Sequence, residues 1–152
     1  MVDIPRIIRA LLGQPEPSEQ LPPLDYKGTM DIHELSSTLI DKFPQTPLYL
    51  PDYWYKTCSV EDVERFLEWD KTNLIPYRSE EHDCDDFAWR LKGQFTQGPW
   101  AALPIGIVWT DVHALCCFVS DDKRFYFIEP QNDLVQVKLE DWQGKEVRFI
   151  AM

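Results

Sequence analysis

Residues 83–95, which read Asp-Cys-Asp-Asp-Phe-Ala-Trp-Arg-Leu-Lys-Gly-Gln-Phe, decide the fold that we expect for this chain. Asp83 is a favourable N-cap residue, because its side chain can accept hydrogen bonds from the free N–H groups of a first helical turn. Phe87, Leu91 and Phe95 then recur at every fourth position, which is the spacing of one apolar helix face. The stretch therefore predicts an amphipathic helix that begins directly after this aspartate.

The periodicity changes after Gly98 and Pro99, which end the helix. Downstream segments show the short apolar or alternating runs, bounded by turn residues, that are typical of strands. Residues 121–123, Asp-Asp-Lys, are typical of a hairpin turn, and residues 139–143 of a single helical turn. The strands that we expect cover residues 103–110, 112–120, 124–129, 134–138 and 147–150.

Helices are expected upstream of this stretch. Asp31 and Ser59 are suitable N-cap residues for helices predicted over 32–42 and 60–69. Residues 2–12 predict a further short helix, and a proline-rich segment without periodicity follows it. The chain then divides into an N-terminal helix (1–13), a Pro-rich linker (14–27) and one domain (28–152). The predicted fold class is α+β, with N-terminal helices followed by an antiparallel sheet.

Composition and charge exclude several classes of function. The hydrophobic content of 44% predicts a folded domain, and the net charge of −11 disfavours nucleic-acid binding. No apolar run approaches the roughly 20 residues of a membrane span, so no membrane association is expected, and no secretory signal is recognised. Cys116 and Cys117 are adjacent in a predicted strand and should point to opposite faces. We therefore expect reduced thiols rather than a disulfide framework, in a cytoplasmic protein.

Cys84 is the candidate nucleophile. The free N–H groups and the dipole of a helix N-terminus stabilise a thiolate, and they could also help to hold an oxyanion. The flanking aspartates act against this, because nearby carboxylates raise the pKa of a thiol. A nucleophilic thiol here therefore needs an imidazolium partner. His33 and His82 are alternatives, but we favour His113, because it opens a predicted strand that can aim its ring at the helix start.

Glu129 and Asn132 are the candidates for the group that orients His113. Glu129 ends the strand that follows in the chain, where an antiparallel hairpin would bring its carboxylate beside the imidazole. Asn132, just past Pro130, could do the same.

Three segments resemble the papain-like and transglutaminase-like cysteine enzymes, and they cover roughly the C-terminal half of the chain. They are Asp-Cys-Asp-Asp-Phe-Ala (83–88), Val-His-Ala-Leu (112–115) and Ile-Glu-Pro-Gln-Asn-Asp (128–133). The cysteine-protease domain of fungal agglutinins, with its Cys-His-Glu triad, is similar too, whereas papain itself separates its Cys and His by about 130 residues. The resemblance implies a papain-like or transglutaminase-like core. It also implies that Cys84 is the nucleophile, His113 the general base, and Glu129 or Asn132 the orienting residue.

The predicted function is a thiol hydrolase or acyl transferase that acts on an amide or ester bond of a peptide, protein or amide substrate, without a cofactor. The alternative is a non-catalytic module of the same fold. Such a module would belong to a larger bacterial or bacteriophage assembly and would contact a protein partner through the N-terminal helix.

Metal binding is a further alternative, which we disfavour. No C-x-x-C pair is present, and two adjacent strand cysteines cannot both face one zinc ion. The aspartates around Cys84 are more simply explained as capping and dipole-compensating residues.

Aromatic residues remain open to several interpretations. Tyr49, Tyr53, Trp54 and Tyr55 could line a groove, the core or a docking patch, and Trp69, Trp89, Trp100, Trp109 and Trp142 are interpreted as packing residues.

Overall fold

A computed structural model describes residues 20–152. These residues form eight strands in two sheets, three α-helices and three 3-10 helices. The helix predicted over residues 2–12 and the first part of the predicted linker lie outside the described residues. The α-helices are α2 (Ile32–Lys42), α3 (Val60–Trp69) and α4 (Cys84–Gln94), and the 3-10 helices are η1 (Thr72–Leu74), η2 (Gly98–Ala102) and η3 (Asp141–Gln143). The strands are β1 (Gly28–Asp31), β2 (Leu48–Tyr49), β3 (Trp54–Thr57), β4 (Ile105–Thr110), β5 (Ala114–Val119), β6 (Phe125–Glu129), β7 (Leu134–Gln136) and β8 (Val147–Ala151).

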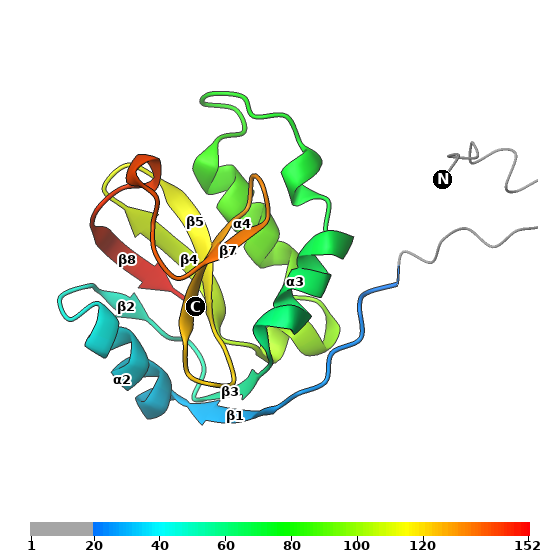
Figure 1. Cartoon of the computed structure of the whole chain (residues 1–152), viewed down its shortest axis with the longest axis vertical. Helices are drawn as coiled ribbons and strands as arrows, with labels where there is room; N and C mark the ends of the chain where they lie inside the picture. Colours follow the sequence, from blue (N-terminus) through cyan, green and yellow to red (C-terminus); the bar gives the residue numbers. More distant parts are fainter. Residues whose placement is uncertain (1–19) are drawn as a thin grey trace, which may run out of the picture.

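The larger sheet has the strand order β2-β8-β4-β5-β6-β7 and lies at the centre of the fold (Figure 1). Strands β4 to β7 pair consecutively in antiparallel fashion, and β8 pairs antiparallel with β4. The short strand β2 instead pairs parallel with β8, with Leu48 opposite Ile150. Strands β1 and β3 form a separate antiparallel pair.

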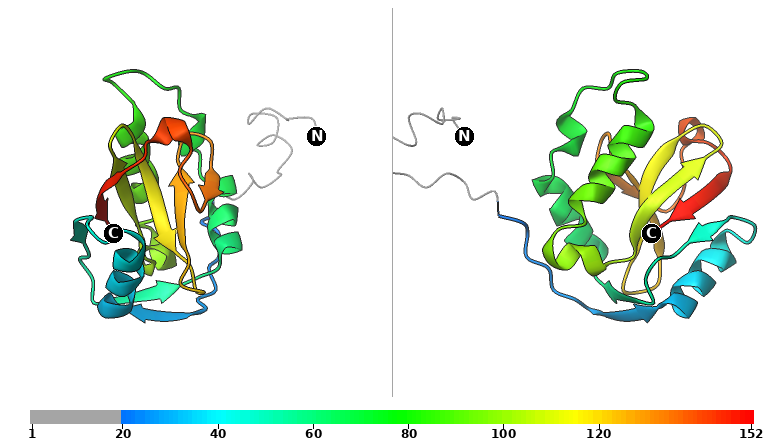
Figure 2. Two further views of the ribbon diagram at one scale, coloured as in Figure 1. Left: turned by 60° about the vertical axis from the view of Figure 1, so that its left-hand side comes forward. Right: turned by 180° about the vertical axis from the view of Figure 1, so that it is seen from behind.

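Helices cover both faces of the larger sheet (Figure 2). One core cluster joins α3 and α4 to the sheet, and a second joins α2 to the opposite face. Strand β5 is buried along its whole length and contributes to both clusters: Cys116 lies in the first and Cys117 in the second. The prediction that these two side chains face opposite ways is therefore confirmed. Each large side chain buried in these clusters stabilises the fold by roughly 1.5–3 kcal/mol.

The three α-helices begin where the sequence predicts them. The Asp31 carboxylate accepts hydrogen bonds from the backbone N–H groups of His33 and Glu34, both at 2.9 Å, and so caps α2. Ser59 caps α3 by accepting from the N–H of Asp62 at 3.2 Å. Helix α4 begins at Cys84 with Asp83 as its N-cap residue. None of the helices in the described part of the chain is long and apolar enough to cross a bilayer.

The predicted fold class, α+β with N-terminal helices followed by an antiparallel sheet around a papain-like or transglutaminase-like core, is wrong. Strands β1, β2 and β3 lie before and between the helices, and eight strands stand against three short α-helices. The sequence signal for these strands is weak, because β1 contains Gly28 and Asp31, which are poor strand formers, and β2 is two residues long. Their partner strands, rather than their own residues, hold them extended.

Part of the predicted linker packs onto the domain. Leu21 and Leu24 contact the core cluster beneath α3 and α4. The indole N–H of the fully buried Trp100 donates a hydrogen bond to the Pro22 carbonyl at 2.9 Å. Residues 21–24 therefore cover the core rather than span open solvent.

Candidate functional site

Cys84 lies at the N-terminus of α4, beside the start of β5. Helix α4 packs against β5, and this packing brings the thiol next to the strand. The backbone N–H of Ala114, the residue that follows His113 in the chain, acts to lower the pKa of the half-buried thiol. The position predicted for the thiol, at a helix start and close to the predicted histidine, is therefore present in the fold.

The surroundings of Cys84 favour the protonated thiol. Burial raises its pKa, and the nearby carboxyl groups of Asp83 and Asp85 raise it further, which outweighs the opposing effect of the Ala114 N–H. A catalytic thiol requires the opposite shift, because the thiolate is the reactive form. Within residues 20–152, no hydrogen bond joins the Cys84 sulfur to the His113 ring.

Asp83 and Asp85 form a carboxyl pair next to the thiol. A hydrogen bond between their side chains lowers the pKa of Asp83 and raises the pKa of Asp85, as expected when two carboxyl groups share one proton. One oxygen of each group and the Cys84 sulfur lie within 4.8 Å of one another. The Asp83 backbone N–H donates to the Asp86 carboxylate at 3.2 Å. Capping and proton sharing thus account for the three aspartates.

His113 and Glu129 meet in the buried part of the site. The His113 Nε2 atom lies 2.8 Å from Glu129 Oε2, and the carboxylate is completely buried. Gln143 Nε2 donates to the same oxygen at 2.9 Å. The pairing predicted between the imidazole and Glu129 is therefore present. Asn132 is not part of it, because its exposed side chain accepts a hydrogen bond from the Leu134 N–H at 3.0 Å.

Sequence reasoning missed two residues that contact this pair. Helix η3 carries Gln143, which is fully buried, and Trp142, whose ring lies edge-on to His113 with centroids 5.0 Å apart. The same Gln143 accepts a hydrogen bond from the Glu140 backbone N–H at 2.9 Å. A glutamine in a single helical turn is ordinarily exposed, so the sequence carries no signal for its burial.

A second surface consists of three aromatic rings, which we call the aromatic platform. Trp89 of α4, Trp109 of β4 and Phe149 of β8 lie in a row, with ring centroids 5.7 and 5.6 Å apart. Trp89 is 55% exposed and Phe149 36% exposed. The sequence predicted that five tryptophans are packing residues. This prediction is wrong for Trp89, and also for Trp142, which is 51% exposed.

The residues of the Tyr49–Tyr55 stretch do not act as one group. Tyr55 is buried, whereas Tyr49, Tyr53 and Trp54 are each more than half exposed. The Tyr53 ring contacts both Trp54 and His33 edge-on. This patch includes one of the alternative histidines, whereas the other, His82, packs its ring against Phe87.

Comparison with known proteins finds solved structures of similar fold, but it does not identify a family. No protein-family model matches the chain, and no curated protein matches it. The solved "PSL1a-E64 complex" matches with a TM-score of 0.70 and 23% identity, over 82% of this chain and 51% of that one. Polyporus squamosus lectin, bound to the human-type influenza-binding epitope Neu5Aca2-6Galb1-4GlcNAc, matches with a TM-score of 0.66 and 24% identity, over 82% and 49%. The chain therefore spans about half the length of these proteins.

These comparisons correct the predicted family and function. One similar structure is described as a lectin, and the other as a complex of PSL1a with E64. The prediction of a cysteine peptidase, amidase or acyl transferase is corrected on that ground, and the raised pKa of Cys84 agrees with the correction. A peptide or amide substrate likewise finds no support. The catalytic roles assigned to Cys84, His113, Glu129 and Asn132 are not tested by these contacts and stay predictions.

Proposed function

We propose that this chain is a non-enzymatic domain that binds a carbohydrate. Two observations support the proposal. The fold is shared with a lectin that was solved with a sialylated oligosaccharide, and the chain presents an exposed aromatic platform. Because the chain spans about half of that lectin, glycan binding by the whole lectin is carried over to this chain as a proposal only.

The platform is the observation that carries the proposal. Indole and phenyl faces stack against the apolar C–H faces of sugar rings, because a pyranose is amphipathic in the same way as these side chains. Trp89, Trp109 and Phe149 come from three different elements whose backbones are fixed by the helix-on-sheet packing. The rings are therefore pre-arranged, which lowers the entropic cost of binding.

A polar group stands beside the rings. Asp85 lies four residues before Trp89 on α4, which places both side chains on one helix face. The aspartate is exposed. Its carboxyl oxygens can therefore accept hydrogen bonds from sugar hydroxyl groups while a ring stacks on the indole. A small number of polar groups beside an apolar surface is the usual composition of a small-molecule site.

The experiment is a titration of the isotope-labelled protein with Neu5Aca2-6Galb1-4GlcNAc and with Galb1-4GlcNAc, followed by NMR. We expect shifts centred on Trp89, Trp109 and Phe149, and a Trp89→Ala variant that binds at least about tenfold more weakly. Trp54→Ala is the matched control, because Trp54 is 63% exposed on the other aromatic patch. The proposal fails if neither sugar binds, or if the Trp54 variant loses binding and the Trp89 variant keeps it.

A further inference from the structure

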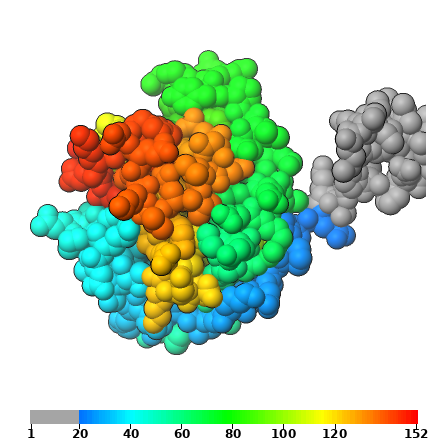
Figure 3. Space-filling model, in the orientation of Figure 1, coloured from blue at the N-terminus to red at the C-terminus, as the bar shows by residue number. Residues whose placement is uncertain are grey.

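A charged feature outside these sites is a groove with a basic rim, which we call the basic groove. Two adjoining pockets of about 610 and 580 Å³ share Lys42, Phe43, Lys145 and Val147. They lie between the end of α2 and the segment from β7 to β8. Figure 3 shows these parts of the chain meeting, where the cyan end of α2 adjoins the orange-red segment.

The rim carries a net positive charge, whereas the protein as a whole is acidic. Four cations line the two pockets against two acidic residues, whereas the chain carries 15 basic and 26 acidic residues. The cations are exposed, and none of them forms an ion pair with another residue in the described part of the chain. The cations are Lys42, Lys138, Lys145 and Arg148, and the acids are Asp141 and Glu146.

The backbone beneath the rim is held in place. Asp111 Oδ1 accepts hydrogen bonds from the N–H groups of Lys145 and Glu146 at 2.9 and 3.2 Å. Gly144 has a φ of 110°, and a Cβ there would lie 2.5 Å from that same oxygen. The hydroxyl of Thr46 donates to the Val147 carbonyl at 2.9 Å and ties the opposite wall to β8. Lys145 is thus carried by a backbone segment that is held in place, and Arg148 follows it in β8.

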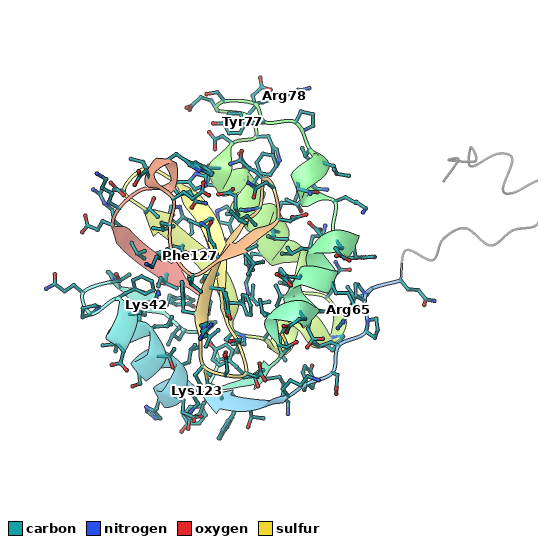
Figure 4. All side chains as sticks on the ribbon, viewed as in Figure 1. Lys42, Arg65, Tyr77, Arg78, Lys123 and Phe127 are labelled. Carbon is teal, nitrogen blue, oxygen red and sulfur yellow. The ribbon has the colours of Figure 1, made fainter. Side chains whose placement is uncertain are left out.

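The lining of the groove is apolar as well as basic. Phe43, Phe127, Val137, Leu139 and Val147 line one pocket, and Phe127 is part of the buried core. Figure 4 shows Lys42 beside Phe127 at this wall. The Lys42 ammonium group lies 5.8 Å from the centroid of the Phe43 ring, which orients it at the rim. A ligand that fits must therefore present acidic and apolar groups together.

We propose that the basic groove binds an extended acidic peptide with interleaved apolar side chains, supplied by a partner protein. Carboxylates of such a peptide would contact Lys145, Arg148 and Lys42, and its apolar side chains would pack on the groove lining. An acidic oligosaccharide matches the charge but offers few apolar groups to this lining. The proposal is independent of sugar binding at the aromatic platform, which uses other residues.

The test is fluorescence polarisation with a short labelled peptide of alternating Asp and Leu, added to the full chain. We expect binding that weakens as salt is raised, since rim charges are screened. Lys145→Gln with Arg148→Gln should weaken binding at least about tenfold. Lys71→Gln with Arg90→Gln is the matched control, because it removes the same charge from exposed positions outside the groove, and it should bind as the unmodified chain does.

Four outcomes would overturn the proposal. They are no binding of the peptide, equal losses in the two double variants, equal binding of a peptide of alternating Asp and Ser, and tighter binding of a sulfated oligosaccharide of matched charge. The Trp89→Ala variant separates this proposal from the proposed sugar site. Unchanged peptide binding in that variant is expected here, whatever its effect on sugars, and a large loss would also count against the basic groove.

Discussion

The Glu129 carboxylate pairs with the His113 imidazole at 2.8 Å in a site from which solvent is excluded on the carboxylate side. The same oxygen accepts a hydrogen bond from Gln143, so one buried acid joins the start of β5, the end of β6 and η3. Removal of the Glu129 carboxylate would leave both His113 Nε2 and Gln143 Nε2 without this partner, which is costly in a buried network.

Glu129→Ala should therefore destabilise the fold by about 2–4 kcal/mol. The physical reason is that His113 and Gln143 would lose a partner that water cannot easily replace. Chemical denaturation followed by circular dichroism measures this, and Glu146→Ala is the control, because Glu146 is an exposed acid whose side chain forms no hydrogen bond within the described chain. Similar unfolding free energies for the two variants would contradict the structural role given to Glu129.

Cys84 should react slowly with iodoacetamide at pH 7, more slowly than N-acetylcysteine. Burial and the neighbouring aspartates raise the pKa of this thiol, so the thiolate fraction at neutral pH is small. The other three thiols are buried and should not react in the folded chain. Mass spectrometry over a series of pH values gives the rate, which should climb above pH 9. Rapid, selective modification at pH 7 would instead reveal an activated thiol and contradict the proposal of a non-enzymatic domain.

Titration of the Asp133 carboxyl group should lower the free energy of unfolding as the pH rises from about 4 to about 6. Burial, followed by the negative charge of Asp70, raises its pKa to about 6, above the value near 3.9 of an unfolded chain. The folded state therefore keeps the proton to higher pH than the unfolded state, and this stabilisation is lost as pH passes through 6.

Asp133→Asn should remove that slope and raise the Tm at pH 7 by about 2 °C, a modest value because the side chain is only partly buried. Asparagine also tolerates the positive φ of 61° at this position. Thermal unfolding at pH 4, 6 and 7 tests the prediction, with the exposed Asp41→Asn as control. An unchanged pH slope in the Asp133 variant would show that another group is responsible.

Gly106→Ala should destabilise the fold by about 3 kcal/mol or prevent folding. A Cβ at this position of β4 would lie 2.2 Å from the Ala151 carbonyl oxygen, which is backbone and cannot move aside. Gly93→Ala is the matched control, since nothing lies within 4 Å of a Cβ there, and alanine should stabilise α4 by about 0.5–1 kcal/mol. Denaturant midpoints compare the two, and a mild effect at Gly106 would contradict the close approach of β8.

Local patterns in the sequence predicted the elements well, whereas the assembly of these elements was harder to predict. The capped starts of α2, α3 and α4 follow from short-range hydrogen bonding, and the sequence carries that information. Strands β1 and β2 exist because distant partners pair with them, and no local pattern specifies a partner.

In the candidate site, too, one contact could be predicted from the sequence, whereas the environment of the thiol could not. The contact between His113 and Glu129 followed from an antiparallel hairpin, and this contact is found. The state of Cys84 did not follow, because the pKa of a thiol depends on burial and on the direction of Asp83 and Asp85. The exposure of Trp89 could not be predicted either, because it depends on how α4 packs against β4 and β5.

The parallel pair of β2 and β8 has a consequence for the kinetics of folding. Leu48 and Ile150 lie 102 residues apart in the chain (150 − 48), so this ladder closes one of the largest loops among the described residues. The entropic cost of such a loop is met only after local hairpins and helices have formed. We therefore expect the β2–β8 pair to form late on the folding pathway, so that weakening it accelerates unfolding and leaves the refolding rate nearly unchanged.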